Sequence, residues 1–315
     1  MITILITGMG YGEVCRAELE KIWEDNGCRV IEEHGPMKES QLLEHPELNQ
    51  IDAIIVYSSS DEITARVMES AENLKVVSRH GLGIDNIDTE AASRLNIKVT
   101  ATRNCNEEAS VADYTMGLML ALARDIPNMS AKTKAGNWYR PLTTDVNGKT
   151  LGIIGLGRIG KLVAQRARAF DMKLIAYDPF EDQAFAKKYD VDYVELENLI
   201  KQADFISINC SLNAQTQDMI GSEELSMMKN TAYLVNCGRG AIVNEWALYQ
   251  ALKKEQISGA AVDVYTHEPP FEDNNPLFYE QLDNLIATSH TAVYTKEVIR
   301  NMDLEATQNI IKNIL

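Results

Sequence analysis

Three polar residues of types common in catalysis occur in the second half of the chain. Arg239, Glu268 and His290 each come shortly after an apolar run that is typical of a buried strand. If these strands are parallel, their carboxyl ends meet at one edge of a sheet, where open α/β sheets bind ligands. The spacing therefore predicts that the three side chains lie at one edge of the sheet.

These residue types suit the reduction of a 2-keto acid. A histidine titrates near neutral pH, so it can give a proton to the substrate oxygen and take it back. A carboxylate beside it fixes the ring, and an arginine binds a substrate carboxylate through two parallel hydrogen bonds. His267 competes with Glu268 within its loop, and His80 competes with His290, so the pattern alone leaves both alternatives open.

A glycine-rich turn precedes this group. Gly155, Gly157 and Gly160 directly follow a strand-like run and open an amphipathic helix, expected over residues 158–170. In such a turn, successive glycines allow the tight bend, the approach of backbone to a diphosphate, and close packing of helix on strand. Asp178 ends the next strand-like run, where a carboxylate accepts hydrogen bonds from ribose hydroxyls and repels a 2′-phosphate. The pattern predicts NAD rather than NADP.

Two other glycine loops follow strands in the first hundred residues. The run Gly8–Gly12 has its third glycine one residue early, with Glu13 where that glycine should stand, so we expect a loop near the substrate rather than a nucleotide site. In the loop His80–Asp85, the glycines Gly81 and Gly83 expose backbone N–H groups that could bind a carboxylate. An ordinary turn is the alternative for this loop.

Composition excludes several functions. The 315 residues are 45% hydrophobic and carry a formal net charge of −16, so nucleic acid and anionic membranes are poor partners. The five cysteines form no Cys-x-x-Cys pair and the amino terminus does not resemble a signal peptide, which predicts a cytoplasmic protein. No apolar run reaches the roughly 18 residues of a membrane span. The histidines lack short metal-ligand spacing, so we expect no metal.

The elements that must position these residues alternate between strands and helices, which predicts an α/β fold with parallel sheets. The expected strands are 2–7, 29–32, 53–57, 76–77, 151–154, 173–177, 204–209, 232–236, 260–265 and 285–288. The final helix, expected over residues 296–314, is followed by no further strand and could return to the first domain.

A nearly all-apolar helix separates the two series. Asn104 and Glu107 have the spacing of a capping box, and residues 111–123 are apolar on nearly every side. Such a helix is buried all round, either against a second subunit or in the core of a monomer. A second helix is expected to start at Pro127 and to end at Gly136.

Together these motifs resemble the D-isomer-specific 2-hydroxyacid dehydrogenases, from about residue 53 to residue 302. The resemblance is carried by the motifs at 155–160, 177–179, 235–240, 263–269 and 289–290. It implies two Rossmann-like, doubly wound domains with the active-site cleft between them. Residues 1–103 and 291–315 would form a discontinuous, flavodoxin-like substrate-binding domain, and residues 104–290 the NAD-binding domain. A homodimer would form through the helix 106–123.

The resemblance also implies roles for single residues. Arg239 would bind the substrate carboxylate, His290 would be the acid and base, and Glu268 would be its partner. The loop Gly81, Leu82 and Gly83 would hold the substrate carboxylate from the other domain. The implied cofactor-binding residues are Gly155, Gly157, Arg158, Ile159, Gly160, Asp178, Cys237, Gly238 and Asp263.

Within the family the chain combines features of two groups. Residues 79–88 and 121–127 look most like phosphoglycerate dehydrogenases, but Tyr57 stands where those enzymes usually carry an arginine that helps to hold the phosphate. Residues 290–295 instead resemble D-lactate dehydrogenases. We therefore expect an NAD-dependent dehydrogenase that acts reversibly on a small D-2-hydroxy or 2-keto acid. The alternatives are a D-3-phosphoglycerate dehydrogenase of serine biosynthesis and an NAD-sensing binding protein similar to the related corepressors.

Overall fold

The chain forms two compact α/β units. The computed structural model describes residues 1–271 and 274–315. Unit 1 contains Met1–Glu107 and Tyr294–Leu315, and unit 2 contains Glu108–Val293. The limits expected from the sequence, 103/104 and 290/291, lie within a few residues of these. Each unit contains one parallel sheet, as the sequence predicted, and the cleft expected between the domains stays a prediction.

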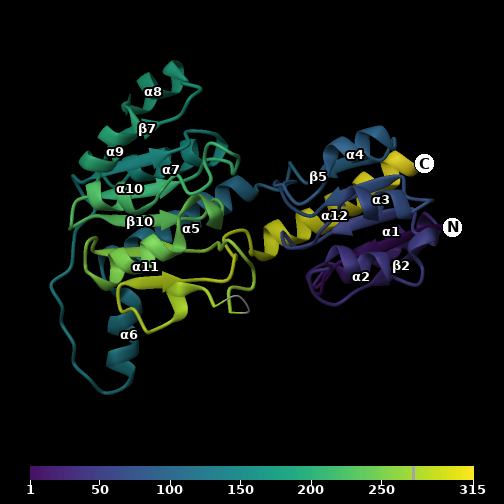
Figure 1. The fold of residues 1–315 in the computed structure, drawn as a ribbon, viewed down its shortest axis with the longest axis horizontal. Coiled ribbons are helices and arrows are strands. Elements are labelled where there is room, and N and C mark those ends of the chain that lie inside the picture. The colour runs from purple at the N-terminus through teal and green to yellow at the C-terminus, as the bar shows by residue number, and fades with distance from the viewer. Residues whose placement is uncertain (272–273) are drawn as a thin grey trace. The chain divides into compact units, whose positions relative to one another are not determined.

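Unit 1, which carries both chain termini (Figure 1), has a five-stranded sheet in the order β2-β1-β3-β4-β5. Its strands are β1 (Ile2–Ile6), β2 (Cys28–Glu32), β3 (Ala53–Val56), β4 (Val76–Arg79) and β5 (Lys98–Ala101). Its helices are α1 (Arg16–Asp25), α2 (Glu39–Leu43), η1 (Leu48–Gln50), α3 (Ala65–Ser70), α4 (Thr89–Arg94) and α12 (Lys296–Ile314). The order reverses between β1 and β3, so the loops after these strands diverge at the switch point where such sheets bind ligands.

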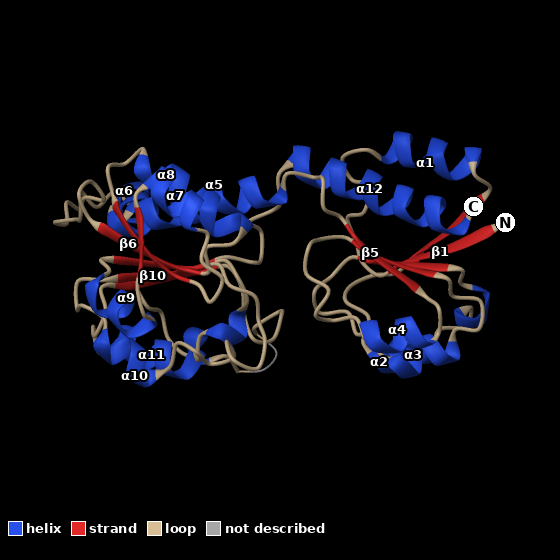
Figure 2. Ribbon diagram, turned by 90° about the horizontal axis from the view of Figure 1, so that it is seen from above, coloured by secondary structure: helices blue, strands red, loops and turns tan. Residues whose placement is uncertain are grey.

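Helices cover both faces of this sheet, with α1 and α12 on one face and α2, α3 and α4 on the other (Figure 2). The first layer packs Leu19, Trp23 and Ala306 against the sheet. The second packs Leu42 and Val67. The last helix α12 contacts β4 and β5, and thus returns to the first domain as expected.

Unit 2 has a seven-stranded sheet in the order β12-β11-β10-β9-β6-β7-β8, all parallel. Its strands are β6 (Thr150–Ile154), β7 (Lys173–Tyr177), β8 (Val191–Tyr193), β9 (Phe205–Ile208), β10 (Tyr233–Asn236), β11 (Gly259–Val262) and β12 (Leu285–Ala287). Its helices are α5 (Glu107–Ala123, whose first residue belongs to unit 1), α6 (Ile126–Lys134), α7 (Arg158–Arg168), α8 (Gln183–Tyr189), α9 (Leu196–Gln202), α10 (Ser222–Met227), η2 (Gly240–Ile242), α11 (Glu245–Lys253) and η3 (Pro276–Phe278).

The core of unit 2 lies on both faces of its sheet. Helices α5 and α7 cover one face with residues such as Met119 and Val163, and α9, α10 and α11 cover the other with residues such as Leu199 and Leu248 (Figure 2). Burying an aliphatic side chain of this size contributes about 1.5–3 kcal/mol. The sheet is therefore a stable platform for the loops at its carboxyl edge.

Two strands were missed in the sequence, and one expected helix start was wrong. The strands β5 and β8 were not predicted, because both are short edge strands that mix polar with apolar residues. Helix α5 begins at Glu107 rather than directly after Asn104. The backbone N–H and Nδ2 of Asn104 instead donate to Glu305, 3.0 Å from its oxygens, and Glu107 accepts from Thr102 at 2.6 Å. A contact with α12, distant in sequence, therefore replaces the local cap.

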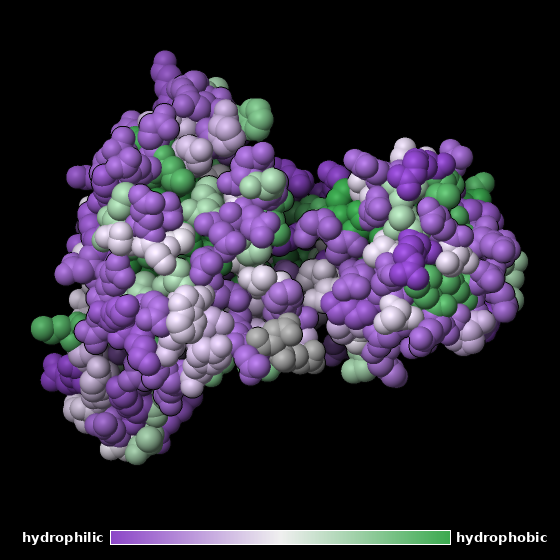
Figure 3. All heavy atoms as spheres, in the orientation of Figure 1, coloured by the Kyte–Doolittle hydropathy of each residue, from purple (hydrophilic) through white to green (hydrophobic). Residues whose placement is uncertain are grey.

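The visible surface is mostly hydrophilic, as Figure 3 shows for one face of each unit. This agrees with the net charge of −16. Among the helices of the described residues, none is both long and apolar enough to cross a bilayer.

Candidate active site

The loops that carry Arg239, Glu268 and His290 follow neighbouring strands of the unit 2 sheet. They leave β10, β11 and β12 in that order. In the sheet, β10 pairs with β11, and β11 pairs with β12. Because the strands are parallel, all three loops start at the carboxyl edge. The fold thus sets three sequence-distant loops side by side.

The Glu268 carboxylate is hydrogen-bonded to the His290 ring. Glu268 Oε2 lies 2.7 Å from His290 Nδ1, and the side chains are 19% and 32% exposed, so the pair is sheltered but reachable. The other oxygen of Glu268 accepts the backbone N–H of Tyr265 at 3.1 Å. A carboxylate held at both oxygens fixes the ring and leaves Nε2 as the nitrogen for proton transfer. The competing His267 lies exposed on the same loop.

A buried aspartate holds the His290 loop in place. Asp263 Oδ1 accepts from Thr288 Oγ1 at 2.6 Å and from the Thr291 N–H at 3.0 Å, and Oδ2 accepts the Ala292 N–H at 2.9 Å. The His290 N–H donates to the Asp263 carbonyl at 2.7 Å, and His290 takes the left-handed φ of 53°. Asp263 thus has a positioning role that the sequence reasoning missed, while its contact with nicotinamide stays a prediction.

The Arg239 loop packs directly against the loop that carries Glu268. A Cβ on Gly240 would lie 1.9 Å from the carbonyl carbon of Tyr265, so only glycine fits there. The Asn236 side chain accepts the Gly238 N–H and donates to the Arg239 carbonyl, both at 3.0 Å. These two hydrogen bonds therefore hold the loop backbone in place at Gly238 and Arg239.

The glycine turn has the geometry that a dinucleotide needs. Gly155 has φ of 91°, and a Cβ there would lie 2.5 Å from the Cys210 nitrogen. A Cβ on Gly160 would lie 2.1 Å from the Gly155 oxygen, so this glycine brings α7 close to the strand. A Cβ on Gly157 would meet nothing within 4 Å, which leaves the amino end of α7 open. Free N–H groups in an open space of this kind fit a diphosphate.

The remaining expected cofactor residues surround this turn. Asp178 accepts the Leu156 N–H and the Phe180 N–H, both at 2.8 Å, so the carboxylate at the end of β7 is oriented beside the turn. Arg158 forms an ion pair with Glu108 at 2.8 Å, and Ile159 packs against the core below α7. These neighbours fit the loop of an NAD site.

Cys237 and Gly238 directly follow β10 at the same edge of the sheet. Burial raises the pKa of the Cys237 thiol to about 12, so it stays protonated at neutral pH and is a poor nucleophile. Gly238 lies close to the backbone, because a Cβ there would lie 3.3 Å from the Ile208 oxygen. Their contact with the cofactor stays a prediction.

The Gly81–Gly83 loop belongs to unit 1 and follows β4. The Gly81 N–H donates to Thr102 Oγ1 at 2.9 Å. The buried Arg79 guanidinium donates to the carbonyls of Val56 (2.8 Å), Tyr57 (2.7 Å), His80 (2.6 Å) and Gly83 (3.1 Å). A positive charge therefore lies under the loop that the sequence assigned to a substrate carboxylate. His80 is buried in unit 1, where it binds Asp303 at 2.9 Å.

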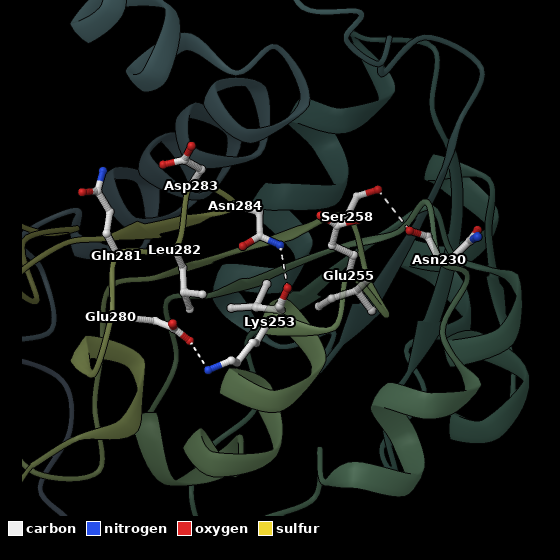
Figure 4. A pocket seen from close by; sticks show the side chains of 11 residues that line it. Asn230, Lys253, Glu255, Ser258, Glu280, Gln281, Leu282, Asp283 and Asn284 are labelled. Atoms are coloured by element: carbon white, nitrogen blue, oxygen red, sulfur yellow. Dashed lines mark hydrogen bonds and ion pairs between the residues drawn. The ribbon is translucent and has the colours of Figure 1, made fainter.

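A hollow of about 660 Å³ in unit 2 lies elsewhere (Figure 4). Its lining residues precede β10, β11 and β12, so it opens at the amino edge of the sheet, opposite the loops described above. Lys253 and Glu280 form an ion pair in its wall. Across residues 1–271 and 274–315, no group of three His, Cys, Asp or Glu residues is placed to hold a metal ion.

Known proteins share this architecture. The family model described as D-isomer specific 2-hydroxyacid dehydrogenase, NAD binding domain, matches residues 116–292. A D-3-phosphoglycerate dehydrogenase of Methanocaldococcus jannaschii is 43% identical over 279 residues, which cover 87% of this chain and 52% of that protein. A hydroxypyruvate reductase of Thermotoga maritima is 38% identical over 280 residues, which cover 87% of this chain and 90% of that protein.

Solved structures agree with these sequence matches. The crystal structure of D-lactate dehydrogenase from Aquifex aeolicus, complexed with NAD and lactic acid, has a TM-score of 0.83 at 27% identity and covers 98% of this chain and 94% of that one. The chain spans about half the length of the phosphoglycerate dehydrogenase that it matches. Unit 2 carries the NAD-binding domain, and the chain belongs to the D-isomer-specific 2-hydroxyacid dehydrogenases.

Proposed function

We propose that this protein reversibly reduces a small 2-keto acid to the D-2-hydroxy acid. The observation that carries the proposal is the 2.7 Å hydrogen bond between Glu268 and His290, on loops that leave neighbouring strands of an NAD-binding domain. NAD(H) supplies or accepts the hydride. A paired imidazole beside that cofactor is the arrangement needed to move the accompanying proton.

Each site residue then has a separate task. Arg239 binds the substrate carboxylate with two N–H groups and draws electron density from the neighbouring carbonyl. His290 Nε2 gives its proton to the carbonyl oxygen as the hydroxyl forms, and takes it back in the reverse direction. Glu268 holds Nδ1 and stabilises the charged ring during this exchange. Asp263 keeps His290 in place through its contacts with the 288–292 loop.

Unit 1 supplies a second contact for the substrate carboxylate. The Gly81 N–H donates to Thr102 within the protein, so the contact falls to Leu82 and Gly83. The Arg79 guanidinium under this loop favours an anion there. The D-3-phosphoglycerate alternative lacks the expected arginine, because Tyr57 occupies that position.

The cofactor preference follows from Asp178. Its carboxylate is fixed beside the glycine turn by the N–H groups of Leu156 and Phe180. Ribose hydroxyls can donate to it, whereas a 2′-phosphate would be repelled. The protein therefore uses NAD rather than NADP.

The functional unit is a homodimer assembled through α5. The exposed residues of this helix, Asp113 and Gly117, are not apolar, but large apolar side chains just beyond it, Ile126 and Leu142, are exposed. The following helix α6 has no buried residue, and Trp138 beyond it is 81% exposed. Apolar surface left uncovered in this way is typical of a subunit interface. Light scattering should therefore give twice the chain mass of 35.2 kDa.

The cytoplasm is the proposed location. All five cysteines are free in the structure, as expected in a reducing compartment.

The test is NADH consumption with a panel of 2-keto acids: pyruvate, hydroxypyruvate, phosphohydroxypyruvate and phenylpyruvate. The wild-type protein should reduce at least one of them, and His290→Ala should lower kcat by several orders of magnitude while NADH still binds. An NAD-sensing binding protein would reduce none and would bind its partner equally well with alanine at position 290. Such a result would refute the enzymatic proposal.

A further inference from the structure

A buried carboxylate joins several segments of unit 1. Asp303 on α12 is fully buried. Its oxygens accept from His80 Nε2 at 2.9 Å and the Gly12 N–H at 3.1 Å, with Cys15 Sγ at 3.7 Å. Burying a carboxylate is costly unless donors surround it, as they do here. Asp303 thus ties α12 to the glycine loop after β1 and to the end of β4.

The His80–Asp303 pair carries net negative charge. Burial lowers the pKa of His80, although Asp303 opposes this effect, so His80 is neutral at pH 7 and donates from Nε2. Arg79 also lowers the pKa of His80, but its guanidinium is turned toward the carbonyls of the Val56–Tyr57 and His80–Gly83 segments. The charge of Asp303 is therefore not cancelled by its histidine partner.

Tyr57 is fixed on top of this pair. Its ring stacks on His80 with centroids 4.8 Å apart and meets Tyr11 edge to face at 6.3 Å. Its hydroxyl lies 2.7 Å from the Tyr294 hydroxyl. A Cβ on Gly8 would come within 2.6 Å of the Tyr57 ring, so the glycine loop lies flat against it. This packing gives a structural reason for glycine in the run Gly8–Gly12, whose spacing does not fit a nucleotide site.

The surroundings of Tyr57 disfavour an added anion. Burial, the Tyr294 contact, and the charges of Asp303 and Glu13 all raise the pKa of Tyr57. Charges that oppose a phenolate also oppose a phosphate placed beside that hydroxyl. The Arg79 guanidinium, by contrast, donates to both the Tyr57 and the Gly83 carbonyls, so the positive charge under the Gly81–Gly83 loop is close by.

We propose that the Asp303–His80 pair, with Tyr57 stacked on it, determines substrate class: unit 1 accepts a 2-keto acid with an uncharged substituent and rejects a phosphorylated one. The substrate carboxylate binds at the Gly81–Gly83 loop above Arg79, and the substituent points toward Tyr57. This inference rests on the proposed reduction of 2-keto acids. Asp303 and His80 are positioning residues, because they act through Tyr57 and through charge.

The experiment compares hydroxypyruvate with phosphohydroxypyruvate, which differ only in the phosphate. The readout is the ratio of the two kcat/KM values with NADH as cofactor. The wild type should favour the unphosphorylated acid by roughly 100-fold. Asp303→Asn should lower this ratio about tenfold and Glu13→Gln about threefold, mainly through KM for the phosphorylated acid, as expected for removal of one charge.

The matched control is Glu24→Gln, which removes the same charge from an exposed position on α1. It should leave the ratio unchanged. If Asp303→Asn fails to fold by circular dichroism, Glu13→Gln decides alone, because Glu13 is exposed and its substitution leaves the core intact.

Two results would overturn the inference while the proposed function stands. One is a wild type that prefers phosphohydroxypyruvate. The other is a ratio of kcat/KM values that is the same in Glu13→Gln as in the control Glu24→Gln, and equally unchanged in Asp303→Asn if that variant folds. A purely structural role would lower the melting temperature without changing this ratio. A wild type that reduces no 2-keto acid at all would instead refute the proposed function, and this inference with it.

Discussion

Substitution of Gly157 by alanine should separate cofactor binding from folding. A Cβ at this position would meet no heavy atom within 4 Å, and the backbone φ of −78° suits alanine. The stability of the protein without cofactor should therefore change by less than about 0.5 kcal/mol. The methyl group would, however, occupy the space through which the backbone approaches the diphosphate.

The loss of NAD affinity follows from the hydrogen bonds that a displaced diphosphate gives up. A hydrogen bond to a charged group contributes about 1.5–3 kcal/mol. If the diphosphate moves out of reach of one or two N–H groups at the start of α7, the loss is about 3 kcal/mol. At about 1.4 kcal/mol per factor of ten, the NADH Kd should rise roughly 100-fold.

Gly160→Ala is the matched control. Its Cβ would lie 2.1 Å from the Gly155 oxygen, roughly 1 Å closer than such atoms normally approach. Forcing α7 away should cost about 1–3 kcal/mol, or roughly 2–12 °C in melting temperature for a domain of this size. Of the two alanines, only the one at position 160 should therefore lower stability measurably.

Fluorescence titration with NADH and thermal unfolding without cofactor check both expectations. The reasoning would be refuted if Gly157→Ala bound NADH like the wild type. It would also be refuted if the two variants lost the same stability.

Three further predictions concern the other sites. Glu268→Gln should lower kcat about tenfold with NADH affinity unchanged, because a charge-assisted hydrogen bond to His290 becomes a neutral one; unchanged steady-state kcat would contradict this role. Asp178→Ala should reduce the preference for NADH over NADPH, measured as the ratio of kcat/KM values, and an unaltered ratio would exclude Asp178 as the discriminating residue. Burial lowers the pKa of His80, so as the pH falls below about 6.5 this histidine is protonated in the unfolded chain before it is protonated in the folded one. The stability of the fold should therefore decrease in this range by up to about 1.4 kcal/mol per pH unit. Thermal unfolding between pH 7.5 and 5.5 should show this loss, and His80→Gln should show less of it; equal slopes would argue against a buried neutral histidine.

The sequence alone determined the class of fold and the order of the loops. Apolar runs and the glycine spacing at 155–160 are local signals, because they depend on residues a few positions apart. They located most strands, the turn before α7 and the last helix. The short edge strands β5 and β8 were not predicted, because an edge strand needs less continuous apolar sequence than a central one. The cap before α5 was wrong because a distant partner, Glu305, binds Asn104 instead.

Only the tertiary structure decided which polar residues meet. It paired Glu268 rather than His267 with His290, and it placed His80 in a buried contact with Asp303, 223 positions away. It also showed Asp263 as the residue that holds the His290 loop. These choices depend on strand order and on a helix that returns across the sheet from the far end of the chain. A hydrogen bond reaches only about 3 Å, so residue types and local spacing cannot specify a partner that the fold brings together from so far along the sequence.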